Sequence, residues 1–173
     1  CVVPGWVHPD GRCDDTIVPG GHAKVVMTAA SATALAGLQG TIHLQPPGLL
    51  VADLTPVGSA AGMHLAWERT EHGASFVLFA EQGAPIGGVR CDTGTRCVQS
   101  VLAVGVVPDT DRVLPAVTHV FVTNLLGSDS LGAAVPACEI AAQARICNGV
   151  SCDFNGDGRL DVRDLVIMVH CVL

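Results

Sequence analysis

Aromatic residues are scarce in this 173-residue chain, which has no tyrosine, two tryptophans and four phenylalanines. Carbohydrate-binding proteins commonly stack sugars on aromatic side chains, and here Trp6 and Trp67 are the main candidates for such a role. Charged residues make up 14% of the chain and the formal net charge is −7, which argues against a nucleic acid as partner. No run of 18 apolar residues is present, so we expect no membrane span.

Catalytic signatures are also missing. The sequence has no Gly-x-Ser-x-Gly nucleophile elbow and no Cys-x-x-Cys pair of the kind that binds zinc or haem. The seven histidines never recur at i, i+3 or i, i+4 spacing, and nothing in the spacing of the glutamates selects a glycosidase pair. We therefore predict a protein that is not an enzyme.

Eight cysteines are present, an even number that favours a disulfide framework in a secreted protein. The chain begins at Cys1 without a methionine, and we expect a mature product whose signal peptide is gone. A lipid-modified Cys1 is an alternative. Eight cysteines allow 105 pairings. Short loops favour four pairs: Cys1–Cys13, Cys91–Cys97, Cys138–Cys147 and Cys152–Cys171.

A twelve-residue segment, 153–164, places oxygen-bearing side chains at the spacing of a calcium loop. Gly158 stands where the loop turns sharply and Leu160 would hold the loop to a core. The predicted ligands are Asp153, Asn155, Asp157, the backbone carbonyl of Arg159, Asp161 directly or through water, and Asp164. A polar Gly-Asp turn without a metal is the plainer alternative. The expected cofactor is Ca²⁺.

The aspartate at the last loop position and the apolar run Leu165-Val166-Ile167-Met168-Val169 after it resemble one repeat of a dockerin. Dockerins usually carry two such loop–helix repeats, and this chain shows one, which makes the segment a half-dockerin. The family often contacts its cohesin partner through small hydroxyl residues at loop positions 10 and 11, where this chain has Val162 and Arg163. A helix that is apolar nearly all round must be buried, on its own domain or on another subunit.

Alternation of apolar and polar residues with a period of two dominates the rest of the chain and predicts β-strands. Within 38–45, Leu38, Ile42 and Leu44 should face inward. The expected strands are 23–29, 38–45, 49–57, 63–68, 75–80, 98–107, 118–124 and 137–147, with residues 2–3 or 6–7 as a short edge strand in an otherwise irregular arm. Residues 98–107 read as a central strand, and a helix is the rival interpretation of 137–147.

Eight or nine short strands with Gly/Pro turns indicate a mainly β chain folded as a β-sandwich. The turn Pro46-Pro47-Gly48, followed by Leu49-Leu50, resembles the early strand pair of a cohesin, and 76–80 and 98–107 fall where that family's central strands would lie. The resemblance implies a jelly-roll sandwich and a protein-binding role. The expected division is an N-terminal arm (1–20), a cohesin-like sandwich (21–147) and a half-dockerin calcium loop with one short helix (148–173).

Relatives of both halves of a binding pair in one chain suggest self-assembly. We expect a secreted, non-enzymatic structural or adhesion protein whose copies join head to tail into an extracellular filament or surface assembly. Its partner would be another copy or a cohesin- or dockerin-type protein. The alternative is a carbohydrate-binding or scaffold module of a larger extracellular enzyme system, with polysaccharide as a partner.

Overall fold

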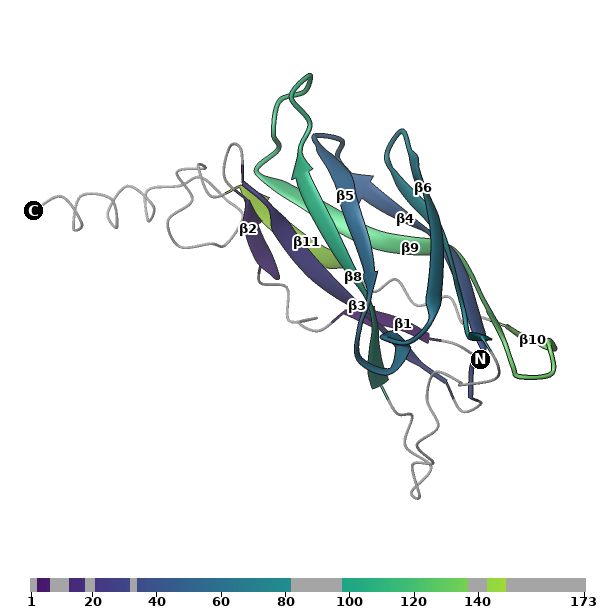
Figure 1. Cartoon of the computed structure of the whole chain (residues 1–173). Helices are drawn as coiled ribbons and strands as arrows, with labels where there is room; N and C mark the ends of the chain where they lie inside the picture. The colour runs from purple at the N-terminus through teal and green to yellow at the C-terminus, as the bar shows by residue number, and fades with distance from the viewer. Residues whose placement is uncertain are drawn as a thin grey trace, which may run out of the picture.

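The computed structural model describes residues 3–6, 13–17, 21–31, 34–81, 98–136 and 143–148. For residues 3–6, 98 and 136 it describes the backbone alone. The predicted calcium loop, the helix predicted after it and residues 149–152 before it therefore lie outside the described residues, as does 137–142 of the predicted last strand. The described part is almost entirely β-structure (Figure 1), with one short 3₁₀ helix, η1 (Gly58–Ala60). No helix within it is long and apolar enough to cross a membrane.

Two sheets form the described part of the chain. The smaller sheet has four strands in the order β1 (Val3–Trp6), β3 (Ala23–Ala30), β8 (Val98–Pro108) and β5 (Leu49–Pro56). The larger sheet has seven strands, six of them in the order β2 (Asp15–Ile17), β11 (Ala144–Asn148), β9 (Val117–Ser128), β4 (Gly37–Gln45), β7 (Gly73–Phe79) and β6 (His64–Thr70), while β10 (Ala134–Pro136) pairs with β9.

The inner faces of the two sheets share one core. Met27 and Leu102 of the smaller sheet and Ile42 and Leu78 of the larger sheet belong to the same buried cluster, and all four are 0% exposed. Burial of apolar side chains from two layers is the main stabilising term of a sandwich. The two sheets therefore form one β-sandwich.

The alternation in β4 is confirmed. Leu38, Ile42 and Leu44 are at most 2% exposed, while Gln39 and Gln45 are exposed. Strict alternation arises because successive side chains of a strand point to opposite sides of the sheet. The strand therefore has one face in the core and one in solvent.

The apolar run from residue 98 forms a central strand, as predicted, because β8 lies between β3 and β5. Val101, Leu102, Ala103 and Val104 are all 0% exposed, so consecutive residues on both sides of this strand are buried. That pattern explains why the sequence shows a continuous apolar run here instead of alternation.

The N-terminal segment contributes more regular structure than the sequence indicated. Its first strand, β1, is an edge strand that pairs antiparallel with β3, in agreement with the predicted short edge strand. Its second strand, β2, was not predicted and pairs in parallel with β11. β10 was not predicted either. Three-residue strands such as these carry too short a pattern to be recognised from sequence.

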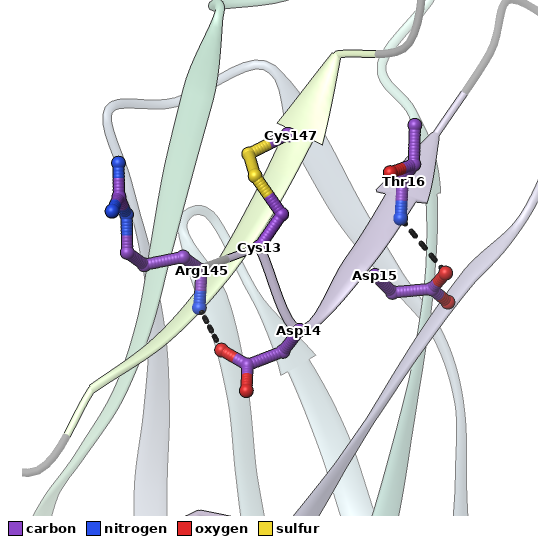
Figure 2. Close-up of a disulfide and its surroundings, with 6 residues drawn as sticks. All are labelled: Cys13, Asp14, Asp15, Thr16, Arg145 and Cys147. Carbon is purple, nitrogen blue, oxygen red and sulfur yellow. Dashed lines mark hydrogen bonds between the residues drawn. A yellow bond between two sulfur atoms is a disulfide. The ribbon is translucent and has the colours of Figure 1, made fainter. Parts of the chain in front are cut away.

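The disulfide of the described residues joins Cys13 to Cys147, with a Cα–Cα distance of 5.7 Å and a sequence separation of 134 (Figure 2). Each cysteine pairs once, so the predicted pairs Cys1–Cys13 and Cys138–Cys147 are both wrong. Pairing by short loops is wrong here because the parallel pairing of β2 with β11 brings together cysteines that are 134 residues apart in the sequence, at one edge of the larger sheet. The pairs Cys91–Cys97 and Cys152–Cys171 lie outside the described residues.

Two hydrogen bonds reinforce the same strand pair. The Asp14 amide donates to the Arg145 carbonyl at 2.7 Å. The Arg145 amide donates to the Asp14 carboxylate at 2.6 Å (Figure 2). Next to them, Asn148 donates its amide to the Ala116 carbonyl at 2.8 Å. The last described strand is thus held on both sides, to β2 and to the start of β9.

Candidate functional site

The outward side of the larger sheet is built from β6, β7, β4 and β9, which lie side by side. The register fixes which side chains share this side. Gln39 of β4 pairs with Val77 of β7 on one flank and with Leu126 of β9 on the other, and these three are exposed. We call the outward side of these four strands the docking face.

Three large apolar side chains are exposed on the docking face. Val77 is 43% exposed, Phe79 is 45% exposed and Leu126 is 49% exposed. Val77 and Phe79 lie on β7 and Leu126 lies on β9, with Gly37 and Gln39 of β4 between them in register, so all three are on one side of the sheet around β4. Single exposed apolar residues are ordinary on protein surfaces, whereas several gathered on one face often mark an interaction site. We call Val77, Phe79 and Leu126 the apolar cluster.

Gly37 makes room for a neighbouring side chain in this part of the face. A Cβ built on Gly37 would lie 2.5 Å from the Ser128 Oγ, so even alanine would force a local shift. The Ser128 hydroxyl thus occupies the space that a side chain at position 37 would fill, next to Phe79 in register.

Toward the other end of the docking face, the side chains are mostly polar and contact one another. The His43 Nε2 lies 2.7 Å from the Thr123 Oγ1, and the imidazole of His43 stacks on the ring of Phe121 with centroids 5.1 Å apart. Thr41 and Ser75 hydroxyls are 3.4 Å apart. Such cross-strand contacts restrict the side chains before any partner arrives, which lowers the entropic cost of binding.

One rim of the face lies on the edge strand β6. The imidazole of His64 stacks on Phe79 with centroids 5.4 Å apart, and its Nε2 is 3.0 Å from a carboxylate oxygen of Glu81. Both groups are largely exposed, so their ion pair contributes little stability. The stacked ring instead holds Phe79 in place at the border of the apolar cluster.

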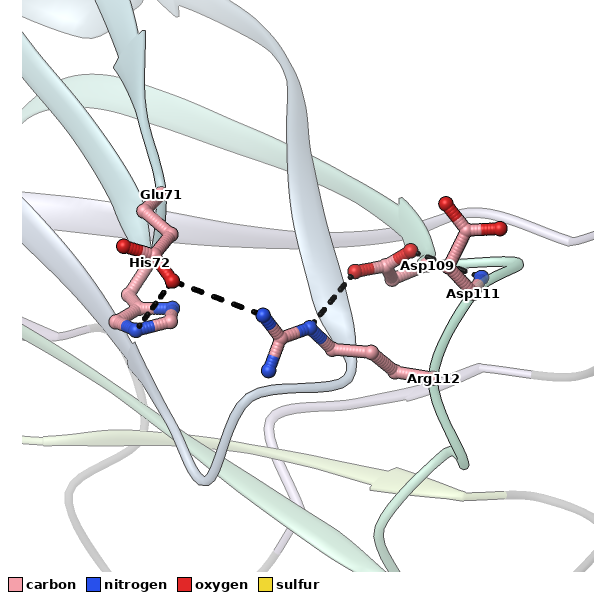
Figure 3. A network of polar contacts seen from close by, with 5 residues as sticks. All are labelled: Glu71, His72, Asp109, Asp111 and Arg112. Atoms are coloured by element: carbon pink, nitrogen blue, oxygen red, sulfur yellow. Dashed lines mark hydrogen bonds and ion pairs between the residues drawn. The ribbon is translucent and has the colours of Figure 1, made fainter.

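A second polar network lies at the end of the sheet where β6 turns into β7. The Glu71 carboxylate is 3.4 Å from the His72 Nε2 and 3.8 Å from the Arg112 guanidinium, which in turn is 3.3 Å from Asp109 (Figure 3). Asp109 also accepts the Asp111 amide at 3.0 Å. These contacts connect the β6–β7 turn to the β8–β9 loop. Each exposed pair is worth about 0–1 kcal/mol, so their role is to position the two connections.

The described residues contain no group of three or more histidines, cysteines, aspartates or glutamates that could hold a metal ion. The predicted calcium ligands, Asp153, Asn155, Asp157, Arg159, Asp161 and Asp164, lie outside the described residues. The docking face was not identified from the sequence. The alternating pattern of residues 73–79 could have suggested that Val77 and Phe79 are exposed. That they share a face with Leu126 depends on the order of the strands in the sheet, which the sequence does not show.

The tryptophans do not form a sugar platform within the described part. Trp67 is 37% exposed, and its neighbour in register is Phe76, which is buried in the core at 2%. Trp67 therefore lies on the core side of an edge strand and not on the docking face. The side chain of Trp6 lies outside the described residues.

Comparison with known proteins shows similarity to cohesins at the level of the fold. The structure superposes on the non-cellulosomal cohesin from Archaeoglobus fulgidus with a TM-score of 0.56 and 15% identity, over 89% of this chain and 95% of that chain. The cohesin module of a family 33 glycoside hydrolase from Clostridium perfringens gives a TM-score of 0.59 and 10% identity, over 85% and 97% of the two chains.

The structure of a type I Coh-OlpA–Doc918 cohesin–dockerin complex from Clostridium thermocellum gives a TM-score of 0.60 at 9% identity, over 84% of this chain and 99% of that chain. No protein-family model matches the sequence. No curated protein matches it either. The predicted cohesin-like sandwich is thus confirmed as a fold.

Proposed function

We propose that this chain is a secreted, non-enzymatic protein-interaction module that binds a dockerin-type partner on its docking face. The observation that carries the proposal is the apolar cluster, in which Val77, Phe79 and Leu126 are each more than 40% exposed on β7 and β9, the two strands that flank β4. Leaving this apolar area in water is unfavourable, and covering it with a partner would recover about 25 cal/mol per Å².

The size of the face suits a small helical partner. Four strands about 4.8 Å apart and a central strand of nine residues, at about 3.3 Å each, give a surface of roughly 19 by 30 Å. Specific interfaces bury about 800 Å² on each partner, and the accessible area of a corrugated face exceeds its flat outline. A loop–helix module of dockerin size would cover most of this surface.

Fold similarity adds support. Two of the similar structures are described as cohesins in complex with dockerins, one as Coh-OlpA with Doc918 and the other as a scaffoldin B cohesin with a Cel5 dockerin. The Cys13–Cys147 disulfide fits an oxidising, extracellular location, since such bonds are rare in the cytosol.

Binding can be tested by titrating the protein with dockerins of the two kinds named above, with heat measured by calorimetry. The variant Val77→Asp should raise Kd about 30-fold, because a buried hot-spot contact is worth about 2 kcal/mol. Val113→Asp is the matched control, since Val113 is 90% exposed in the β8–β9 loop. No binding to either dockerin, or equal Kd for the two variants, would argue against a dockerin-type partner on this face.

Calcium belongs to the same proposal. Residues 153–164 bind one Ca²⁺ through the predicted oxygens, which orders the loop and presents the following apolar run to a partner. Calcium titration of the whole chain should give one site, and Asp157→Asn should weaken it about tenfold because a charged ligand is lost. Asp111→Asn, which changes an exposed aspartate of the described part, is the control. Identical isotherms for wild type and Asp157→Asn would exclude this loop as the metal site.

Self-assembly completes the proposal. Copies of the chain join head to tail in calcium, as the presence of a cohesin-like face and a dockerin-like segment in one sequence suggests. A role as a carbohydrate-binding or scaffold module of a larger enzyme system remains the second candidate from the sequence, but the orientation of Trp67 toward the core side does not favour a sugar platform.

A further inference from the structure

The described chain leaves the sandwich at the far end of the docking face from the apolar cluster. β11 pairs antiparallel with β9, so that Cys147 lies opposite Val117, and the Asn148 amide binds the Ala116 carbonyl at 2.8 Å. Leu126 is at the other end of β9, beside β10. Figure 1 shows β11 and β10 at opposite ends of the larger sheet.

The separation follows from strand geometry. Leu126 lies nine positions along β9 from Val117, and a strand rises about 3.3 Å per residue, so roughly 30 Å separate the exit from the cluster. Val77 and Phe79 are two strands further across the sheet from β9. They are therefore at least as far from the exit as Leu126.

The direction of the chain matters as much as the distance. Because β11 runs antiparallel to β9, the end of β11 lies beside the start of β9, whereas Leu126 lies near the end of β9. At Asn148 the chain therefore points away from the apolar cluster. To return over the docking face it must reverse, and residues 149–152 are the four residues of link before the predicted loop. Four residues span at most about 14 Å when extended. Because they must also reverse the chain direction, they carry the predicted loop no nearer to the cluster.

The predicted calcium loop adds little reach. Twelve residues wrapped around one ion, with ligands about 2.3–2.6 Å from it, form a compact unit on the order of 10 Å across. A helix over residues 165–173 would add about 14 Å at 1.5 Å per residue. After the reversal, the segment would cover roughly 24 Å of the face. Its apolar run, residues 165–169, would lie roughly 10–18 Å from the exit, over the polar half around His43 and Phe121 and short of the cluster at roughly 30 Å.

We infer that the apolar cluster of each copy is occupied by the C-terminal segment, residues 153–173, of a second copy. The inference rests on the proposed docking function of the face and on the predicted calcium loop. The apolar run Leu165-Val166-Ile167-Met168-Val169 supplies the chemistry that Val77, Phe79 and Leu126 require. Because the face and the segment are different surfaces, the contact is heterologous, and repetition gives an open chain unless the rotation happens to close a ring.

The disulfide fits this arrangement. In a head-to-tail assembly, a force applied to the C-terminal segment is transmitted to the sandwich at Asn148, immediately after Cys147. The disulfide to Cys13 distributes this force over both β11 and β2, which pair over only three positions. A covalent link at this position keeps the exit strand from peeling away from the sheet edge.

The test uses two full-length variants in millimolar calcium, with mass measured by light scattering on a sizing column. Val77→Asp disables the face, and Ile167→Asp disables the segment. Each variant alone should run at the 17.7 kDa mass of one chain, whereas wild type should be several-fold heavier. An equimolar mixture of the variants should give twice 17.7 kDa, because each retains the half that the other lacks. Val113→Asp should assemble like wild type.

Three outcomes would overturn the inference: a monomeric wild type, a mixture that stays monomeric, or a Val77→Asp variant that assembles like wild type. The dockerin titration separates this failure from failure of the proposed function. If dockerins bind wild type but bind Val77→Asp about 30-fold more weakly, while wild type stays monomeric, the face is a docking site and its occupant is another protein.

Discussion

Replacing both Cys13 and Cys147 by alanine tests how much the covalent link between two distant parts of the sequence contributes to stability. The bond closes a loop with a sequence separation of 134, and the chain-entropy treatment gives about 17 cal/mol/K for such a loop, or about 5 kcal/mol at 25 °C. Domains of this kind are stable by about 5–15 kcal/mol. The double variant should therefore lose a third or more of its free energy of unfolding.

The folded state should change little at the site itself. Two hydrogen bonds between Asp14 and Arg145 do not depend on the sulfur atoms: the Asp14 amide donates to the Arg145 carbonyl at 2.7 Å, and the Arg145 amide donates to the Asp14 carboxylate at 2.6 Å. Cys147 is 9% exposed at a strand near the sheet edge, so alanine leaves a small gap that solvent can reach. The expected loss thus comes mainly from the greater freedom of the unfolded chain.

Urea unfolding followed by tryptophan fluorescence provides the measurement. With m values of about 2–3 kcal/mol/M, the midpoint should fall by roughly 2 M. The slope m should also rise, because an unfolded chain without the link exposes more surface. A loss below about 2 kcal/mol with an unchanged slope would refute the reasoning, since it would mean that the bond does not restrict the unfolded chain as calculated.

Further predictions concern single positions. Ile42→Ala should cost about 2–5 kcal/mol in urea unfolding, because Ile42 is 0% exposed, whereas Gln45→Ala on the same strand should change the free energy of unfolding by less than about 0.5 kcal/mol. Gly58→Ala should cost at least about 1–2 kcal/mol, because Gly58 has φ of 57° and its Cβ would lie 2.5 Å from the Ser100 carbonyl oxygen. Gly62→Ala, whose Cβ would meet nothing within 4 Å, should be neutral or slightly stabilising, and equal losses at the two glycines would contradict the backbone argument.

Local pattern was enough to predict most of the sandwich. The strands predicted at 38–45 and 98–107 correspond to β4 and β8, because one alternates between core and solvent and the other is buried throughout. The predicted strands at 23–29, 49–57, 63–68, 75–80 and 118–124 likewise correspond to β3, β5, β6, β7 and β9. The short strands β2 and β10 could not be predicted, since their existence depends on the strands that they pair with.

The two parts of the candidate site also differ in how far the sequence predicts them. The calcium loop at 153–164 is a local motif, in which all ligands come from one short segment, so the sequence alone predicts it and it stays a prediction. The docking face is non-local. Val77 and Leu126 are neighbours across Gln39 only because β4 inserts between β7 and β9.

By itself, the sequence determined a mainly β, disulfide-containing chain with strands in nearly the right places, because periodicity and cysteine content are properties of short windows or of composition. Tertiary structure alone decided that Cys13 meets Cys147 and that Val77, Phe79 and Leu126 form one exposed cluster. It also decided that the chain leaves the sheet about 30 Å from that cluster. The physical reason is that strand order and register are set by how two whole sheets bury their inner faces together, and no local stretch contains that information.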